Sequence, residues 1–207
     1  MNTSDSRRNY LHNQKSSGRK LIGVFPAQFP RELLWAFNIL PVEIWDPLVE
    51  IAQAKKHLQP YICSIAQGGL EFILQGKSSQ VDGYLFPHTC DSIQNLASIV
   101  NDYLDTGKPC FFFYHPKATD RQPAREFYHN QLIQLINQLE NYFSSIMTER
   151  LQECIKTSRD LYSRLDELFN LRKQGLLKIP NSEFYTTLRR GEFLWPTDYI
   201  SELENLL

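Results

Sequence analysis

GYLFPHTCDS, at residues 83–92, joins a predicted strand to a predicted helix. The apolar run over residues 83–86 is typical of a short buried strand. Apolar side chains then recur at helical spacing from Ile93 to Leu104, which indicates a helix. Cys90 therefore lies where that helix begins. A strand that turns directly into a helix is the repeating unit of α/β proteins.

The same unit recurs along the first half of the chain, where short apolar runs end close to prolines and alternate with segments of helical spacing. The predicted strands are residues 20–25, 41–45, 83–86 and 110–114, and the predicted helices between them are residues 30–37, 65–76 and 93–104. From about residue 121 the pattern is helical almost throughout, with long helices over residues 127–143 and 151–171 and short ones near residues 182–190 and 198–206. We therefore predict an α/β fold with an open, mainly parallel four-stranded sheet, helices on both faces in flavodoxin-like or Rossmann-like layering, and a helical C-terminal segment.

We expect these elements to form one domain. Residues 20–120 would be the α/β core, and residues 121–207 would supply long helices that complete the same domain. Residues 1–19 are rich in Asn, Ser and Arg, and they predict a mobile or loosely attached arm.

Composition and charge exclude several classes of protein. With 42% hydrophobic and 22% charged residues, the chain has the composition of a soluble globular protein. Its 22 basic and 23 acidic residues give a net charge of -1, which gives no support to a nucleic-acid partner. No apolar run approaches the roughly 20 residues needed to span a bilayer, and the first residues lack the apolar core of a secretion signal. We therefore expect a cytoplasmic protein with no membrane partner.

The four cysteines include no CxxC pair and differ in their predicted settings. Cys63 and Cys90 each precede a predicted helix, where free N–H groups and the positive end of the helix dipole favour a thiolate and hence a metal ligand. Cys110 falls inside a predicted strand and Cys154 inside a long helix. Three alternatives stay open for the first pair: ordinary buried thiols, a zinc site, which the lack of close-spaced ligand pairs disfavours, and a redox-active thiol pair, which the lack of CxxC disfavours.

Other residues near these turns have both a structural and a functional interpretation. Asp91, Ser92 and Ser64 suit helix caps better than catalysis. The glycines at residues 68–69 would allow either a ligand to approach the backbone or close helix packing. The aromatic run at residues 111–114 is more typical of core than of a cofactor stack.

Four segments, in their order and spacing, resemble the 2-hydroxyacyl-CoA dehydratase and benzoyl-CoA reductase family, and in particular the N-terminal domain of its 2-hydroxyglutaryl-CoA dehydratase D-component. The segments are residues 23–32, residues 40–45, residues 63–64 and, above all, residues 86–92. The resemblance runs from about residue 20 to the end of the sequence. It implies a subunit of two similar α/β domains that hold a 4Fe-4S cluster at their junction through three cysteines. Two of these correspond to Cys63 and Cys90, and the third belongs to a second domain that this sequence does not include.

The resemblance also implies a chemistry and a set of partners. An ATP-dependent activator protein would deliver one electron to the cluster, and the electron would convert the thioester carbonyl of an acyl-CoA substrate into a ketyl radical anion, leading to dehydration or to ring reduction. A second dehydratase or reductase subunit would complete the enzyme. His88 would donate a hydrogen bond to a cluster sulfur or to the thioester oxygen, and equally it could only satisfy loop carbonyls.

We expect the site in the crevice beyond the strand ends, where residues 61–64 and 87–92 should meet. The alternative function is a non-catalytic interaction or scaffold module, derived from that family, that binds no cluster.

Overall fold

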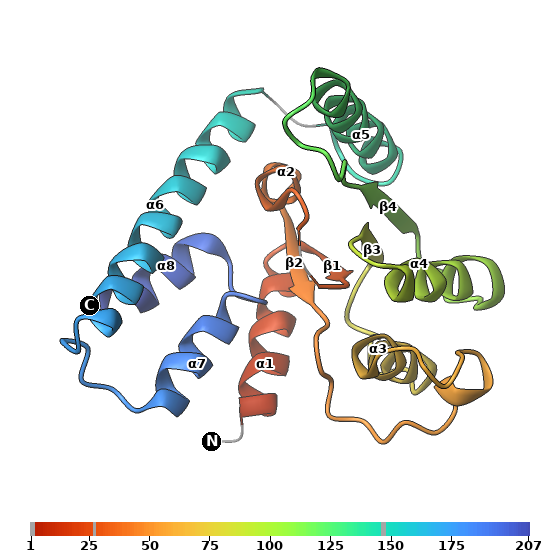
Figure 1. The fold of residues 1–207 in the computed structure, drawn as a ribbon, viewed down its shortest axis with the longest axis horizontal. Coiled ribbons are helices and arrows are strands. Elements are labelled where there is room, and N and C mark those ends of the chain that lie inside the picture. Colours follow the sequence, from red (N-terminus) through yellow and green to blue (C-terminus); the bar gives the residue numbers. More distant parts are fainter. Residues whose placement is uncertain (1–2, 27, 146–147) are drawn as a thin grey trace.

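A four-stranded sheet forms the centre of the molecule (Figure 1). The computed structural model describes residues 3–26, 28–145 and 148–207. The strands are β1 (Lys20–Val24), β2 (Ile39–Glu43), β3 (Gly83–His88) and β4 (Cys110–Tyr114), in the spatial order β2-β1-β3-β4. All three pairings are parallel. The predicted α/β fold with an open parallel sheet is therefore confirmed.

Helices cover both faces of the sheet, also as predicted. One face carries α3 (Ser64–Leu74) and α4 (Asp91–Ser98), and the other carries α2 (Arg31–Ala36) and α5 (Gln122–Glu140). The alternation of side chains along β1 serves both layers, because Leu21 packs with the α3 and α4 layer while Ile22 and Val24 pack with the α2 and α5 layer. Burial on both faces explains why the strands are nearly continuous apolar runs.

The remaining elements complete these layers. A short 3-10 turn, η1 (Ala54–Lys56), lies in the connection from β2 to α3, and a π-helical stretch, η2 (Ile99–Tyr103), prolongs α4. After α5 come α6 (Thr148–Lys173), α7 (Asn181–Arg190) and α8 (Pro196–Glu204). Helix α6 packs against α2 and α8, and Ser158 donates a hydrogen bond of 2.5 Å to Glu32 across the α6–α2 contact.

The N-terminal region differs from the mobile or loosely attached arm that the sequence suggested. Residues 1–2 lie outside the described residues, but Thr3–Ser16 form helix α1. Leu11 is buried, Lys15 pairs with Asp82 at 2.8 Å, and the Tyr10 hydroxyl donates to Asp198 at 2.5 Å. Polar contacts with distant parts of the chain hold this helix in place. Its sequence has no apolar stripe, so the sequence pattern could not predict the helix.

The C-terminal helices also close the β2 edge of the sheet. The Glu43 N–H donates to the Glu192 carbonyl at 2.8 Å, so the end of this edge strand is paired with the segment between α7 and α8. The Glu43 carboxylate is only 3% exposed; it forms an ion pair with Arg31 and accepts a 2.9 Å hydrogen bond from Trp45. A buried carboxylate requires such partners.

The two adjacent glycines of α3 have different structural roles. A Cβ atom on Gly69 would lie 2.5 Å from the ring of Phe25, a distance that real side chains do not tolerate, whereas one on Gly68 would meet Pro47 at an ordinary 3.8 Å. Phe25 is fully buried and stacks on Phe86 with ring centroids 4.8 Å apart. Gly69 therefore serves close helix packing: it sets how near α3 lies to the sheet.

This difference predicts opposite outcomes for two matched substitutions. Gly69→Ala should lower the free energy of unfolding by about 1–3 kcal/mol, because it overpacks the contact with Phe25. Gly68→Ala should leave it unchanged or raise it by up to about 1 kcal/mol, because alanine favours the helix. Urea unfolding of both variants measures the effect, and equal stabilities would contradict the packing role of Gly69.

Candidate functional site

The carboxyl edge of the sheet, between β1 and β3, is the candidate site. The chain leaves β1 towards β2 and leaves β3 towards β4, so these neighbouring strands diverge there, and α/β proteins bind ligands at such a point. Cys90 lies two residues after the end of β3. Cys63 lies at the same edge, because α3 leads into the start of β3 and must therefore begin at the opposite, carboxyl end. The structure thus brings both predicted cysteines to one edge of the sheet.

Each of these cysteines is the N-cap residue of its helix. Cys63 and Cys90 have extended backbones, and their carbonyls accept the first helical hydrogen bonds from Gln67 at 3.1 Å and Gln94 at 3.2 Å. Both side chains are exposed and form no cap hydrogen bond. The amides of each first turn therefore lack a side-chain cap, and they point towards the space beside the thiol.

The sequence predicted Ser64, and Asp91 or Ser92, as helix N-caps, and these predictions are wrong by one or two positions. Ser64 and Asp91 are the first helical residues, and the cysteine before each holds the cap position. Asp91 still stabilises α4, because its negative charge lies in the first turn near the positive end of the helix dipole.

Helices α3 and α4 are neighbours on one side of the sheet (Figure 1). Both helices begin at the carboxyl edge of the sheet, so the two cysteine-bearing ends lie on the same side of the same layer.

The path of the chain towards Cys63 depends on a buried carboxylate that the sequence pattern did not predict. Glu71, in α3, is fully buried and accepts hydrogen bonds from the backbone of Ala52 at 3.0 Å and of Ala54 at 2.8 Å, and from Gln75 at 2.9 Å. Burial opposes its ionisation, but these hydrogen bonds outweigh burial and lower the pKa of Glu71. The carboxylate therefore ties the connection between β2 and α3 to the helix that Cys63 opens.

The other two cysteines have a different environment. Cys110 lies in β4 and Cys154 in α6, and both are half-buried. Burial, with a contribution from Asp102, raises the pKa of the Cys110 thiol to about 11, and burial also raises the pKa of Cys154. Burial therefore disfavours the thiolate form of both side chains. No group of three or more His, Cys, Asp or Glu side chains in the described part of the chain could hold a metal ion.

His88 is the last residue of β3 and stands opposite Tyr114 of β4, with ring centroids 5.3 Å apart. Its Nε2 atom is buried and has no hydrogen-bond partner among the described residues. The imidazole lines a cavity of about 50 Å³ together with Gln94, Ser98 and Tyr114. This small cavity, whose lining is mainly apolar, lies beside the turn that carries Cys90.

Three polar residues of this cavity were not among the predicted site residues. Tyr114 belongs to the aromatic run that the sequence assigned to the core, yet it is 37% exposed because it ends β4 at the same edge as His88. The pairing of neighbouring strand ends is the signal that could have identified it. Gln94 and Ser98 occupy successive turns of α4, and only the packing of that helix reveals them.

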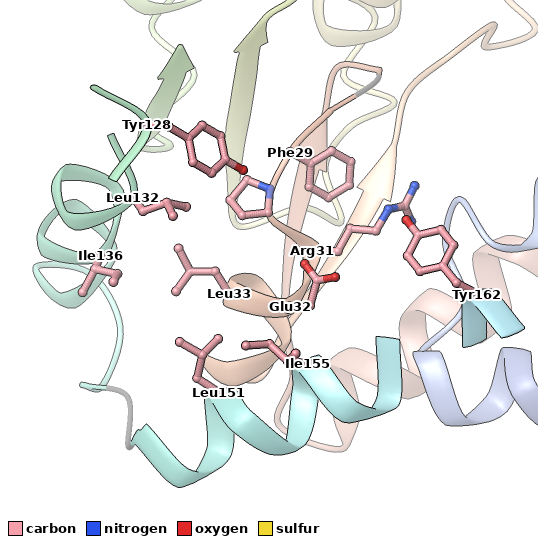
Figure 2. A pocket seen from close by; sticks show the side chains of 11 residues that line it. Phe29, Arg31, Glu32, Leu33, Tyr128, Leu132, Ile136, Leu151, Ile155 and Tyr162 are labelled. Carbon is pink, nitrogen blue, oxygen red and sulfur yellow. The ribbon is translucent and has the colours of Figure 1, made fainter. Parts of the chain in front are cut away.

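A larger cavity, of about 330 Å³, lies on the other face of the sheet, between α2, α5 and α6 (Figure 2). Its lining is mainly apolar, with Leu33, Leu132 and Ile136 among the residues that point into it. It contains neither cysteine, so it is separate from the thiol edge.

Comparison with known proteins identifies the family of this chain. The family model of the 2-hydroxyglutaryl-CoA dehydratase D-component matches residues 26–207. The chain belongs to this family. The resemblance drawn from residues 23–32, 40–45, 63–64 and 86–92 is therefore confirmed.

Three relatives show how far the similarity extends. The chain is 26% identical to the beta subunit of (R)-2-hydroxyglutaryl-CoA dehydratase from Acidaminococcus fermentans, over 98% of the chain and 54% of that protein. It is 28% identical to a benzoyl-CoA reductase subunit from Thauera aromatica, over 91% and 50%. It is 27% identical to the (R)-phenyllactyl-CoA dehydratase beta subunit from Clostridium sporogenes, over 77% and 42%. The chain thus spans about half the length of these relatives.

None of the described helices combines the length and the apolar character needed to cross a bilayer.

The role assigned to Glu71 predicts a pH-dependent loss of stability. Glu71→Gln should lower the free energy of unfolding at neutral pH by about 1–3 kcal/mol, because a charged acceptor of buried amides is lost. The folded protein favours the ionised carboxylate, so its contribution is complete above the unfolded pKa of about 4.3 and disappears as the pH falls through the lower folded pKa. The difference from the unmodified protein should therefore shrink in acid. Urea unfolding at several pH values measures it, with the exposed Glu153→Gln as a control that should change little.

The contrast among the cysteines predicts two classes of thiol. Cys63 and Cys90 should react with a maleimide at neutral pH at least about tenfold faster than Cys110 and Cys154, because they are exposed while burial shields the other two thiols and raises their pKa. Mass spectrometry of peptides taken over time identifies the modified residues, and all four should react once the protein is unfolded. Fast modification of Cys110 would contradict the assignment.

Proposed function

We propose that this chain is part of an iron–sulfur subunit of a 2-hydroxyacyl-CoA dehydratase or benzoyl-CoA reductase type of enzyme, with Cys63 and Cys90 as two of the thiolate ligands. The observation that carries the proposal is the shared position of these cysteines. Both are exposed N-cap residues of neighbouring helices at the carboxyl edge, in a chain that belongs to the 2-hydroxyglutaryl-CoA dehydratase D-component family.

The donor set fits one side of such a cluster. Iron–sulfur clusters are held by cysteine thiolates, and hydrogen bonds to their sulfurs and solvent exposure set their potentials. Cys63 and Cys90 offer two thiols that no cap hydrogen bond occupies, and the first-turn amides of α3 and α4 supply donors beside them. The described residues contain no third cysteine at this edge, so the proposal requires further ligands from outside them.

The cluster would supply one-electron transfer to the thioester of an acyl-CoA substrate. The role of this chain would be to hold and orient the cluster. Glu71 fixes the approach to Cys63, and β3 fixes the position of Cys90. His88 has a buried Nε2 without a partner among the described residues, beside the Cys90 turn, where it could donate a hydrogen bond to a sulfur or to the thioester oxygen.

The same proposal implies partners and a cellular location. They are an acyl-CoA substrate, a second dehydratase or reductase subunit that supplies the remaining surface of the site, and an ATP-dependent activator protein that donates the electron. A low-potential cluster of this kind would operate in the reducing environment of the cytoplasm, where free thiols persist.

Anaerobic reconstitution of the full chain with iron and sulfide tests the ligand assignment. After removal of unbound metal, the protein should retain iron and acid-labile sulfide, and Cys63→Ser and Cys90→Ser should each reduce this content at least about tenfold. Cys110→Ser and Cys154→Ser are the matched controls, because their thiols lie in a strand and in a long helix away from this edge.

The opposite result would favour the alternative function. A colourless protein whose iron content and thermal stability are the same with and without the two cysteines would contradict the proposal. It would support an interaction or scaffold module of this family that binds no cluster.

A further inference from the structure

Helix α6 has an exposed side on which apolar and charged residues alternate. Ile155, Tyr162 and Phe169 recur every seven residues and are 39%, 54% and 49% exposed. Arg159 and Asp166, also exposed, lie between them at helical spacing. These five residues are called the α6 face. A neighbouring side of the helix is buried against the domain, through Ser158, Leu161 and Leu168.

The α6 face is complementary to the α6 face of a second copy in antiparallel orientation. If a second copy of the helix lies antiparallel with the two Tyr162 rings at the centre, Ile155 comes opposite Phe169 at both ends. Arg159 of one copy then lies almost level with Asp166 of the other copy, with an offset of one residue, or about 1.5 Å along the axis. The two-fold symmetry creates this pairing twice. Apolar positions meet apolar positions, and charges meet opposite charges, which is what a two-fold symmetric interface requires.

The two charges of the α6 face have no partners within the described structure. Neither Arg159 nor Asp166 takes part in an ion pair with any described residue, whereas the nearby Arg164 of the same helix contacts Asp160, Glu167 and Glu204. The domain thus pairs some charges of this helix internally and leaves one opposite pair beside exposed apolar side chains.

The α6 face borders a cavity of the same domain. Ile155 and Tyr162 point into the cavity of about 330 Å³ between α6, α2 and α5 (Figure 2). This cavity is a groove beside α6, with an apolar floor that includes Leu33. A second helix packed on the α6 face at the usual separation of about 8–10 Å would cover Ile155 and Tyr162, and its side chains would fill part of this groove.

We infer that the α6 face is the docking surface for a second copy of this chain, which binds through its own α6 in antiparallel orientation. The contact runs from Ile155 to Phe169, a length of roughly 21 Å of helix. Aromatic and aliphatic side chains form its centre, and the two Arg159–Asp166 pairs fix its orientation. This inference goes beyond the proposed function and does not depend on a cluster or on acyl-CoA.

Charge reversal tests the inference on the full chain. Sedimentation velocity over a range of concentrations should show a monomer–dimer equilibrium for the unmodified protein. Arg159→Asp or Asp166→Arg alone should weaken the dimer at least about tenfold, because each brings like charges together twice. A mixture of the two variants should dimerise again, since the acidic face of one then meets the basic face of the other. The double variant should also recover.

The controls separate this effect from loss of fold. Lys156→Asp reverses an exposed charge on α6 outside the α6 face and should leave the dimer intact. Circular dichroism should show the same helix content and melting temperature for all variants. A protein that is monomeric at every concentration, or single variants that dimerise as well as the unmodified protein, would overturn the inference. Failure of the mixed variants to recover would exclude the antiparallel pairing.

Discussion

The connection from β2 to β3 constrains everything at the carboxyl edge. Since β1 lies between these strands, the chain must cross β1 to join them. Crossovers between parallel strands are almost always right-handed, so α3 must pack on the face opposite to α2, beside α4. Parallel strands place the starts of both helices at one edge. Cys63 and Cys90, 27 positions apart in the sequence, share that edge as a consequence of sheet topology.

Two further devices set where α3 lies within that layer. The contact of Gly69 with Phe25 fixes the distance of the helix from the sheet, and the Phe25–Phe86 stack transmits that distance to β3, the strand that carries Cys90. The hydrogen bonds of Glu71 fix the path of the chain that leads to Cys63. Packing therefore couples the two cysteine turns without any direct bond between them.

Most of the fold could be predicted from the sequence, because buried parallel strands and amphipathic helices leave clear patterns. The ends of the strands could not. The third strand was predicted to end at Phe86, yet β3 continues through Pro87 to His88. Proline is tolerated there because β1 pairs with β3 only as far as Leu85, so that Pro87 needs to pair with β4 alone. Helix α1 was missed for a different reason, since polar contacts to distant residues hold it.

The candidate site was predictable where one residue type met one local pattern, as with cysteines at helix starts. It was unpredictable where it depends on contacts between separate elements, such as the pairing of strand ends at Tyr114 or the hydrogen bonds from Glu71 to the β2–α3 connection. The environment then distinguishes four identical thiols. Burial raises the pKa of the Cys110 and Cys154 thiols, while Cys63 and Cys90 are exposed at the N-termini of two helices. A group held by thiolates and inorganic sulfide is anionic, and helix N-termini stabilise anions. The proposed iron–sulfur group would therefore find two of its thiol ligands and a favourable electrostatic field at this edge, which a pair of buried structural cysteines would not offer.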